Sequence, residues 1–263
     1  MTTTRIRALA NQKGGVGKTT TSVNLAASLA ATRRRVLLVD MDPQGNATMG
    51  SGVDKYHLAY SALDLMLGDV GASDAIRPAA DHGYDIIPAN GDLTAAEVGL
   101  MQVQEKEYRL RAALEPILGR YDYVLIDCPP SLNMLTVNAL AAAHGVVIPI
   151  QCEYYALEGL TALMKTIERI RENVNRELEI DGLLRTMFDP RNNLANDVSA
   201  QLIAHFGDRV YRTIIPRNVR LAEAPSYGIP VLNYDRASSG ALAYLALAGE
   251  IIRRDERSRN GTD

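Results

Sequence analysis

The chain has 263 residues, enough to bury a full hydrophobic core as one large α/β domain or two smaller ones. Its 28 basic and 31 acidic residues give a formal net charge of −3, which by itself predicts no nucleic-acid partner. It contains no run of about 18 apolar residues and no signal-peptide pattern, so we expect neither a membrane span nor export.

Cys128 and Cys152 are the two cysteines, too few and too far apart for a disulfide framework or a Cys-x-x-Cys metal site. Each lies in or beside an apolar run, so we expect both to be small buried side chains. The sequence therefore predicts a cytoplasmic protein.

A glycine-rich stretch, NQKGGVGKTT, occupies residues 11–20, between an apolar strand-like run and a helical pattern. Glycine lets backbone N–H groups close around phosphate oxygens, and the helix N-terminus adds further donors. Lys18 is then placed to bind the β and γ phosphates, and Thr19 to ligate Mg²⁺. The glycine that usually begins this loop is replaced by Gln12, and a second lysine, Lys13, follows it.

Two apolar runs, residues 36–40 and 123–127, predict buried parallel strands that end in Asp40 and Asp127. Open α/β sheets bind ligands at this end of their strands. Asp42 is either a carboxylate on the same side as Asp40 or only a turn residue. An apolar strand that ends in Asp127, downstream of a phosphate loop, is typical of a Walker B strand, whose carboxylate holds Mg²⁺ through water.

The alternation of strand and helix patterns predicts a P-loop NTPase-like α/β fold, a single doubly wound, mostly parallel sheet flanked by helices. Residues 1–254 are expected to form the domain, and residues 255–263 a polar, disordered tail. Further strands are expected at residues 84–88, 145–150 and 183–188, and helices at residues 58–67, 93–118 (one or two), 157–174 and 240–253.

Two late segments, residues 189–197 and 215–230, read as polar loops with short helices. They contain Arg191 in the first and Arg217 and Arg220 in the second. From the residues alone, these arginines are either a solvated surface or part of a binding site.

Four segments together resemble the ParA-type (Soj-like) chromosome and plasmid partition ATPases, which belong to the deviant Walker A branch of the P-loop NTPases. They are KGGVGKTT at residues 13–20, VLLVDMDPQGNAT at 36–48, YDYVLIDCPPS at 121–131 and IPRNVRLAEAPSYGIPV at 215–231. The resemblance extends over nearly the whole chain. Without an N-terminal helix-turn-helix extension, the chain looks like the short type, which is not expected to bind an operator.

The resemblance implies three catalytic residues. Lys18 would bind the phosphates in its own subunit, Lys13 would reach the nucleotide of a partner subunit, and Asp42 would orient the attacking water. The implied nucleotide contacts are Lys13, Gly14, Gly15, Val16, Gly17, Lys18, Thr19, Thr20, Pro216 and Asn218. The implied Mg²⁺ site consists of Thr19, Asp40 and Asp127, and the implied DNA contacts are Arg191, Arg217 and Arg220.

The resemblance also implies a cycle. ATP and Mg²⁺ would drive formation of a homodimer that sandwiches the nucleotides and binds double-stranded DNA without sequence preference. Hydrolysis, weak in the protein alone and stimulated by a ParB-type centromere-binding partner, would release the DNA. Such a protein is expected to associate with the nucleoid and not with a membrane.

One alternative stays open at this point: a ParA-like ATPase that positions another cargo, such as chemotaxis clusters or enzyme compartments. A MinD-like membrane-associated regulator is disfavoured because the C-terminal tail lacks an apolar face. A nitrogenase-type iron protein is disfavoured because neither Cys128 nor Cys152 lies in a glycine-rich ligand loop.

Overall fold

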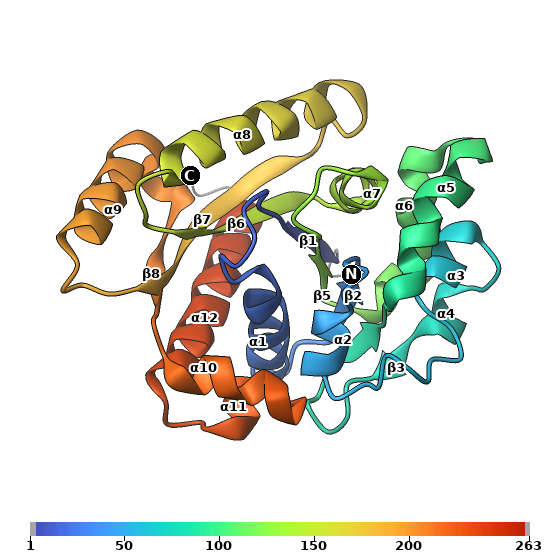
Figure 1. Ribbon diagram of the computed structural model, residues 1–263, viewed down its shortest axis with the longest axis horizontal. Helices are drawn as coiled ribbons and strands as arrows, with labels where there is room; N and C mark the ends of the chain where they lie inside the picture. Colours follow the sequence, from blue (N-terminus) through green and yellow to red (C-terminus); the bar gives the residue numbers. More distant parts are fainter. Residues whose placement is uncertain (1–3, 261–263) are drawn as a thin grey trace.

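The computed structural model describes residues 4–260, which form one eight-stranded sheet with helices on both faces (Figure 1). The strand order is β3-β4-β2-β5-β1-β6-β7-β8, and neighbouring strands are parallel except at the β3–β4 edge. This confirms the predicted doubly wound fold. The strands are β1 (Arg5–Leu9), β2 (Val36–Asp40), β3 (Arg77–Pro78), β4 (Asp85–Ile87), β5 (Tyr123–Asp127), β6 (Gly145–Gln151), β7 (Glu179–Phe188) and β8 (Val210–Pro216).

Helices connect these strands and cover the sheet. The α-helices are α1 (Lys18–Ala31), α2 (Asn46–Gly50), α3 (Ala62–Leu67), α4 (Ala72–Ala75), α5 (Ala95–Gly99), α6 (Arg109–Leu114), α7 (Met134–Ala142), α8 (Ala156–Asn173), α9 (Asn193–Phe206), α10 (Val219–Glu223), α11 (Val231–Tyr234) and α12 (Ser239–Asn260). Short 3-10 turns are η1 (Gly91–Thr94), η2 (Leu100–Gln102), η3 (Lys106–Tyr108), η4 (Glu115–Arg120), η5 (Gly207–Arg209) and η6 (Ala224–Tyr227). No helix within the described residues is long and apolar enough to cross a membrane.

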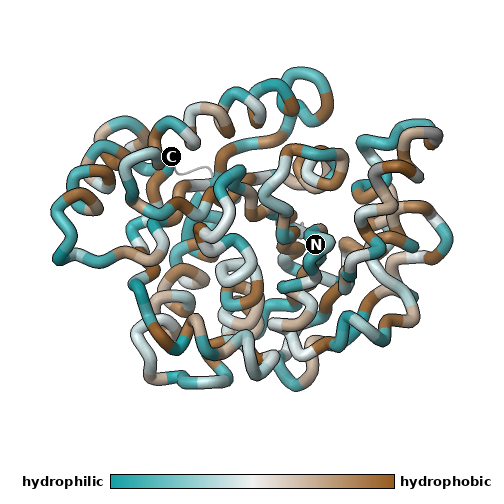
Figure 2. Tube along the Cα trace, in the orientation of Figure 1, coloured by the Kyte–Doolittle hydropathy of each residue, from teal (hydrophilic) through white to brown (hydrophobic). Residues whose placement is uncertain are grey.

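Each central strand supplies side chains to two apolar cores, one on each face of the sheet. On β5, Tyr123 and Leu125 pack into the core under α1 and α12, whereas Val124 and Ile126 pack into the core under α7 and α8. Figure 2 shows the apolar residues gathered along the strands and on the inner sides of the helices. Because both faces are covered, the central strands are apolar on both sides and are recognisable in the sequence as continuous apolar runs.

The C-terminal ends of β1, β2 and β5 lie at the same edge of the sheet. Asp127 on β5 is in register with Leu9 on β1 and with Asp40 on β2. The loop that leaves β1 at this edge leads directly into α1. The glycine-rich loop and the two strand-end aspartates are therefore brought together by the sheet itself.

Several regions differ from the sequence-based expectations. The segment 189–197, expected to be a polar loop with short helices, contains the start of the 14-residue helix α9. The strand β8 lies in a stretch for which no strand was predicted, because it lacks a continuous apolar run, and four of its seven residues are exposed or only partly buried. Residues 93–118, expected to form one or two helices, instead form a series of short helical turns. The series is interrupted by extended backbone at Val103 and left-handed backbone at Glu105.

The end of α12 also differs. A helix ending at residue 253 and a disordered tail over residues 255–263 were expected, but the helix continues to Asn260, and residues 261–263 lie outside the described part. The carboxylate of Asp255 is buried and accepts hydrogen bonds from Arg7 Nη2 at 2.6 Å and from the Tyr123 hydroxyl at 2.8 Å. These partners on β1 and β5 hold the polar end of the helix against the sheet.

We expect Asp255→Ala to destabilise the fold by about 3 kcal/mol, because it leaves the buried Arg7 guanidinium without one of its two carboxylate partners. The measurement is the free energy of unfolding in urea. Glu256→Ala is the matched control: Glu256 is exposed and lies 3.7 Å from Arg34, so its loss should change stability little. Equal losses for the two variants would contradict the docking of this helix end.

Candidate functional site

The glycine-rich loop has a backbone that only glycine adopts easily. The φ angles are 74° at Gly15 and 87° at Gly17, in the left-handed region. Gly17 is the N-cap of α1, whose first turn contains no acidic side chain. The unpaired N–H groups and partial positive charge of this helix end are thus left uncompensated by the chain, as an anion-binding loop requires.

Lys18 lies inside this loop. Its side chain is largely buried, and Nζ donates to the Lys13 carbonyl oxygen at 3.1 Å. Burial lowers the pKa of Lys18, and the nearby charge of Asp127 opposes that shift. An ammonium group in this position is available to a phosphate that enters the loop.

Asp127 ties the start of α1 to the end of β5. One carboxylate oxygen accepts from the Thr19 hydroxyl at 2.8 Å, and the other accepts from the Ser22 hydroxyl at 2.7 Å. A hydroxyl beside a carboxylate is an oxygen donor set that suits Mg²⁺. Within residues 4–260, no cluster of three or more His, Cys, Asp or Glu side chains could hold a metal. Magnesium at Thr19 and Asp127 would therefore take its other ligands from phosphate and water, as it commonly does.

Asp40, the other predicted metal residue, is fully buried beside Asp127 and is hydrogen-bonded within the chain. One oxygen accepts from the Asp42 N–H at 3.1 Å, and the other accepts from the Thr48 N–H at 2.8 Å and from its hydroxyl at 2.7 Å. Burial, with the charge of Asp127, raises the pKa of Asp40 to about 8, and burial raises the pKa of Asp127 to about 6. Asp40 thus lies next to the predicted metal site, with its oxygens bound to the loop after β2.

Asp42 occupies the turn after β2 and is also largely buried. Its carboxylate accepts from the Gln44 N–H at 3.0 Å, so Asp42 does stabilise the turn, as one of its two interpretations predicted. The charge of Asp42 also acts on Lys18 and on Asp127, so the same carboxylate lies at the candidate phosphate site. Its role in orienting water stays a prediction.

Lys13, the second lysine of the loop, is oriented differently from Lys18. Its side chain is 45% exposed, and Nζ forms an ion pair with Glu153 Oε2 at 2.6 Å. The Asn11 side chain accepts from the Lys13 N–H and donates to the Pro149 carbonyl, which fixes the entrance of the loop. One lysine is therefore buried within the loop and the other lies at the surface.

The remaining nucleotide-site candidates fall into two groups. Gly14 and Gly15 are exposed at the loop, Val16 is buried and Thr20 is half-buried. Pro216 ends β8, and Asn218 follows it as the N-cap of α10. The Asn218 side chain accepts from the Leu221 N–H at 3.3 Å and donates to the Ser239 hydroxyl at 2.8 Å. Its predicted contact with the adenine base stays a prediction.

The two arginine loops meet at neighbouring strand ends. The Arg191 guanidinium donates to both oxygens of Asp189, at 2.9 and 2.7 Å, just beyond β7. The Arg217 N–H, just beyond β8, donates to the Phe188 carbonyl at 3.2 Å. Hydrogen bonds from Arg191, and the charge of Arg217, lower the pKa of Asp189 to about 2.

Arg220, the third candidate DNA contact, lies on α10 and is exposed. Its guanidinium forms ion pairs with Glu223 at 2.8 Å and with Asp235 at 3.3 Å. Both Arg191 and Arg220 are thus paired with carboxylates of their own chain.

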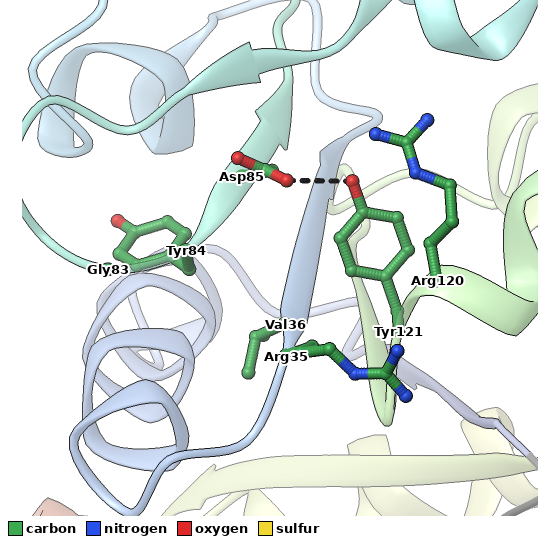
Figure 3. A pocket seen from close by; sticks show the side chains of 7 residues that line it. All are labelled: Arg35, Val36, Gly83, Tyr84, Asp85, Arg120 and Tyr121. Atoms are coloured by element: carbon green, nitrogen blue, oxygen red, sulfur yellow. Dashed lines mark hydrogen bonds between the residues drawn. The ribbon is translucent and has the colours of Figure 1, made fainter.

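A surface hollow of about 240 Å³ lies at the opposite end of the sheet, where β2, β4 and β5 begin (Figure 3). The hydroxyl of Tyr121 donates to Asp85 at 2.8 Å across it. Arg35, on its rim, is bound to Asp122 at 2.9 Å. Tyr84 and Arg120, which also line it, are bound to Ser51 at 2.8 Å and to Ser73 at 3.3 Å. The hollow is separated from the glycine-rich loop by the length of the strands.

Glu153 and Thr186, which were not predicted from the sequence, both contact the loop. Glu153 binds Lys13, and the Thr186 hydroxyl donates to the Val16 carbonyl at 2.8 Å. Glu153 follows β6, and Thr186 lies two residues before the end of β7. A polar residue at or near the end of an apolar strand is the signal that identified Asp40 and Asp127, and it could have found these two as well.

Nearly the whole chain is similar to known proteins. A protein-family model described as an AAA domain matches residues 4–180. The chain is 54% identical over 257 residues to the chromosome partitioning protein ParA of Caulobacter vibrioides, which covers 97% of this chain and 96% of the relative. It is 51% identical over 247 residues to the sporulation initiation inhibitor protein Soj of Bacillus subtilis, which covers 94% and 98%.

Solved structures share the fold. A Mycobacterium smegmatis protein described as cobyrinic acid a,c-diamide synthase, with bound ADP and magnesium, is 39% identical and has a TM-score of 0.85. The similarity covers 97% of this chain and 96% of that chain.

We expect Asp127→Asn to gain stability relative to wild type as pH rises, in the absence of metal and nucleotide. Burial raises the pKa of Asp127 from 3.8 to about 6, so the folded wild type retains a proton that the unfolded chain releases. The contribution of Asp127 to the stability of the fold therefore falls as pH rises from about 4 to about 6, by on the order of 2 kcal/mol. Asparagine removes this loss.

The measurement is urea unfolding of both proteins at several pH values across this range. Asp122→Asn is the control, because hydrogen bonding to Arg35 lowers the pKa of Asp122 and its pH dependence has the opposite sign. A stability difference between Asp127→Asn and wild type that stays constant from pH 4 to 7 would disprove the burial effect.

Proposed function

Because the chain belongs to the ParA/Soj family of chromosome-partitioning proteins, we propose that it is an ATP-dependent DNA-segregation protein. The observation that supports this most directly is the opposite placement of the two loop lysines. Lys18 is buried inside the loop, where it can bind phosphates of its own nucleotide, while Lys13 is exposed and can reach another subunit.

The proposed reaction is hydrolysis of ATP to ADP and phosphate. Thr19 and Asp127 would hold magnesium, whose charge would offset that of the phosphates. Lys18 and the N–H groups of the α1 N-terminus hold the phosphates, and Asp42 orients the attacking water. Phosphoryl transfer needs such positioning and charge stabilisation more than it needs covalent chemistry by the protein.

The proposed assembly is a dimer with the two nucleotides at its interface. Lys13 of one subunit stabilises negative charge on the nucleotide of the other, in the way that an arginine finger does. The exposed Gly14 and Gly15 allow close approach at this surface, since no atom lies within 4 Å of a side chain built at either glycine. Because the nucleotide is part of the interface, ATP binding favours the dimer and hydrolysis favours release.

The proposed ligand of the dimer is double-stranded DNA, bound through its phosphates at Arg191, Arg217 and Arg220. Phosphate contacts need only a local cluster of basic residues, so the formal net charge of −3 does not oppose them. Two such clusters in one dimer act together and raise the affinity well above that of a monomer. A ParB-type centromere-binding protein would stimulate the weak basal hydrolysis and so release the DNA.

We expect Asp42→Ala to lower ATP turnover about 100-fold while the ATP-bound dimer is retained, because only the positioning of water is lost. Lys13→Ala should lower turnover at least as much and abolish the dimer, because it removes the contact between subunits. Turnover is measured by phosphate release, and dimerisation by light scattering with a non-hydrolysable ATP analogue. Lys165→Ala, at an exposed position on α8, is the control. A Lys13→Ala protein that dimerises normally would contradict the proposed role of this lysine.

We expect ATP-bound protein to bind DNA more tightly than ADP-bound protein, and Arg220→Ala to weaken binding about tenfold through lost phosphate contacts. DNA is titrated at several salt concentrations with each nucleotide, and dimerisation is measured in parallel. Arg171→Ala, at an exposed position on α8, should bind DNA as wild type does. Equal DNA affinity with ATP and ADP would overturn the proposed function. Loss of dimerisation in Arg220→Ala would indicate a structural role for Arg220 instead.

A further inference from the structure

The end of β7 contacts the glycine-rich loop across the sheet. The Thr186 hydroxyl donates to the Val16 carbonyl at 2.8 Å, and both residues are buried. Thr186 is the last residue of β7 that pairs with β6, where it is in register with Gln151. Beyond it, Met187 and Phe188 extend past the β6 ladder, and Phe188 is in register with Pro216 on β8.

Met187 has an unusual backbone conformation at this contact. Its φ angle is 49°, in the left-handed region, which a non-glycine residue adopts at an energetic cost. It packs against Gly17, because a side chain built there would meet Met187 Cε and the Thr186 side chain at 3.8 Å. The strained residue therefore lies against Gly17, the N-cap of α1.

The arginine loops begin within two residues of this point. The Phe188 carbonyl accepts from the Arg217 N–H at 3.2 Å. The next residue, Asp189, holds the Arg191 guanidinium through both carboxylate oxygens. The segment from Thr186 to Asp189 thus touches the glycine-rich loop at one end and both arginine loops at the other.

We propose that this segment, Thr186–Asp189, couples the phosphate loop to the arginine loops within one subunit, with Thr186 as the positioning residue. The proposal rests on the function proposed above. The C=O and N–H of a trans peptide point in opposite directions, so the hydrogen bond to the Val16 carbonyl sets the direction of the Gly17 N–H. When phosphate draws that N–H group toward itself, the Val16 carbonyl turns with it, and Thr186 and Met187 follow.

Such coupling is reciprocal. If nucleotide binding restrains the arginine loops, restraint of those loops must raise nucleotide affinity by the same factor. It also acts in each subunit and so adds to the effect of dimerisation, which brings two arginine clusters together. The arginine loops of a monomer should therefore already respond to nucleotide.

The test is hydrogen exchange of the backbone amides of residues 188–192 in full-length protein, with and without a magnesium-bound, non-hydrolysable ATP analogue. The protein is kept dilute, and light scattering confirms the monomer. We expect nucleotide to slow exchange in wild type and in Thr186→Ser, which keeps the hydroxyl, by at least about fivefold. Thr186→Val, similar in shape but without the hydroxyl, should lose this response while still binding nucleotide. Thr213→Val is the matched control. In wild type the Thr213 hydroxyl donates to Glu250 on α12 and not to the glycine-rich loop, so this variant should respond as wild type does.

An unchanged response in Thr186→Val, or no response in wild type, would overturn the proposal. If Thr186→Val does not fold, Met187→Ala replaces it, because it removes the side-chain contact with Gly17 and should likewise reduce the response. DNA plays no part in this measurement. Failure of ATP-dependent DNA binding would therefore overturn the proposed function and leave the coupling standing. Failure of the hydrogen-exchange response would overturn the coupling and leave the proposed function standing.

Discussion

The hydrogen bonds from Thr19 and Ser22 to the buried Asp127 hold the start of α1 against the end of β5. The rest of the site depends on this contact, because it fixes the helix N-terminus beside the strand-end carboxylates. Burial of Asp127 and Asp40 is costly, since it raises the pKa of both carboxyl groups, and the hydrogen bonds from Thr19 and Ser22 offset part of that cost at Asp127. A cation at Thr19 and Asp127 would offset that cost, so the fold is better suited to the metal-bound state than to the metal-free one.

The two lysines of the loop place one ammonium group inside the subunit and the other at its surface. Lys18 is enclosed and bound to the Lys13 carbonyl, so its ammonium can act only within its own loop. Lys13 is exposed, and its ammonium group is paired with Glu153. An exposed ion pair contributes little stability, and Lys13 can therefore leave Glu153 at small cost.

The sequence predicted the parts of this structure that depend on local pattern. Strands covered on both faces, such as β2 and β5, are continuous apolar runs, and their expected bounds coincide with the observed ones. The edge strand β8 and the end of α12 were not predicted, because each is stabilised by partners remote in sequence. The contacts of Lys13 with Glu153 and of Val16 with Thr186 join residues that are 140 and 170 positions apart in the chain. The loop itself was therefore recognisable from local sequence, but the residues that contact it were not.

The arrangement of charge around the arginine loops favours a DNA-binding unit larger than one subunit. Arg191 is bound to Asp189, and Arg220 is bound to Glu223 and Asp235, so neighbouring carboxylates offset much of the positive charge in a monomer. A DNA phosphate must compete with these carboxylates for each guanidinium, which weakens every single contact. Affinity then has to come from the number of contacts, and a dimer doubles that number on one ligand. In the proposed function, the nucleotide forms the dimer. DNA binding would therefore depend on the nucleotide, because only the dimer makes enough of these weak contacts.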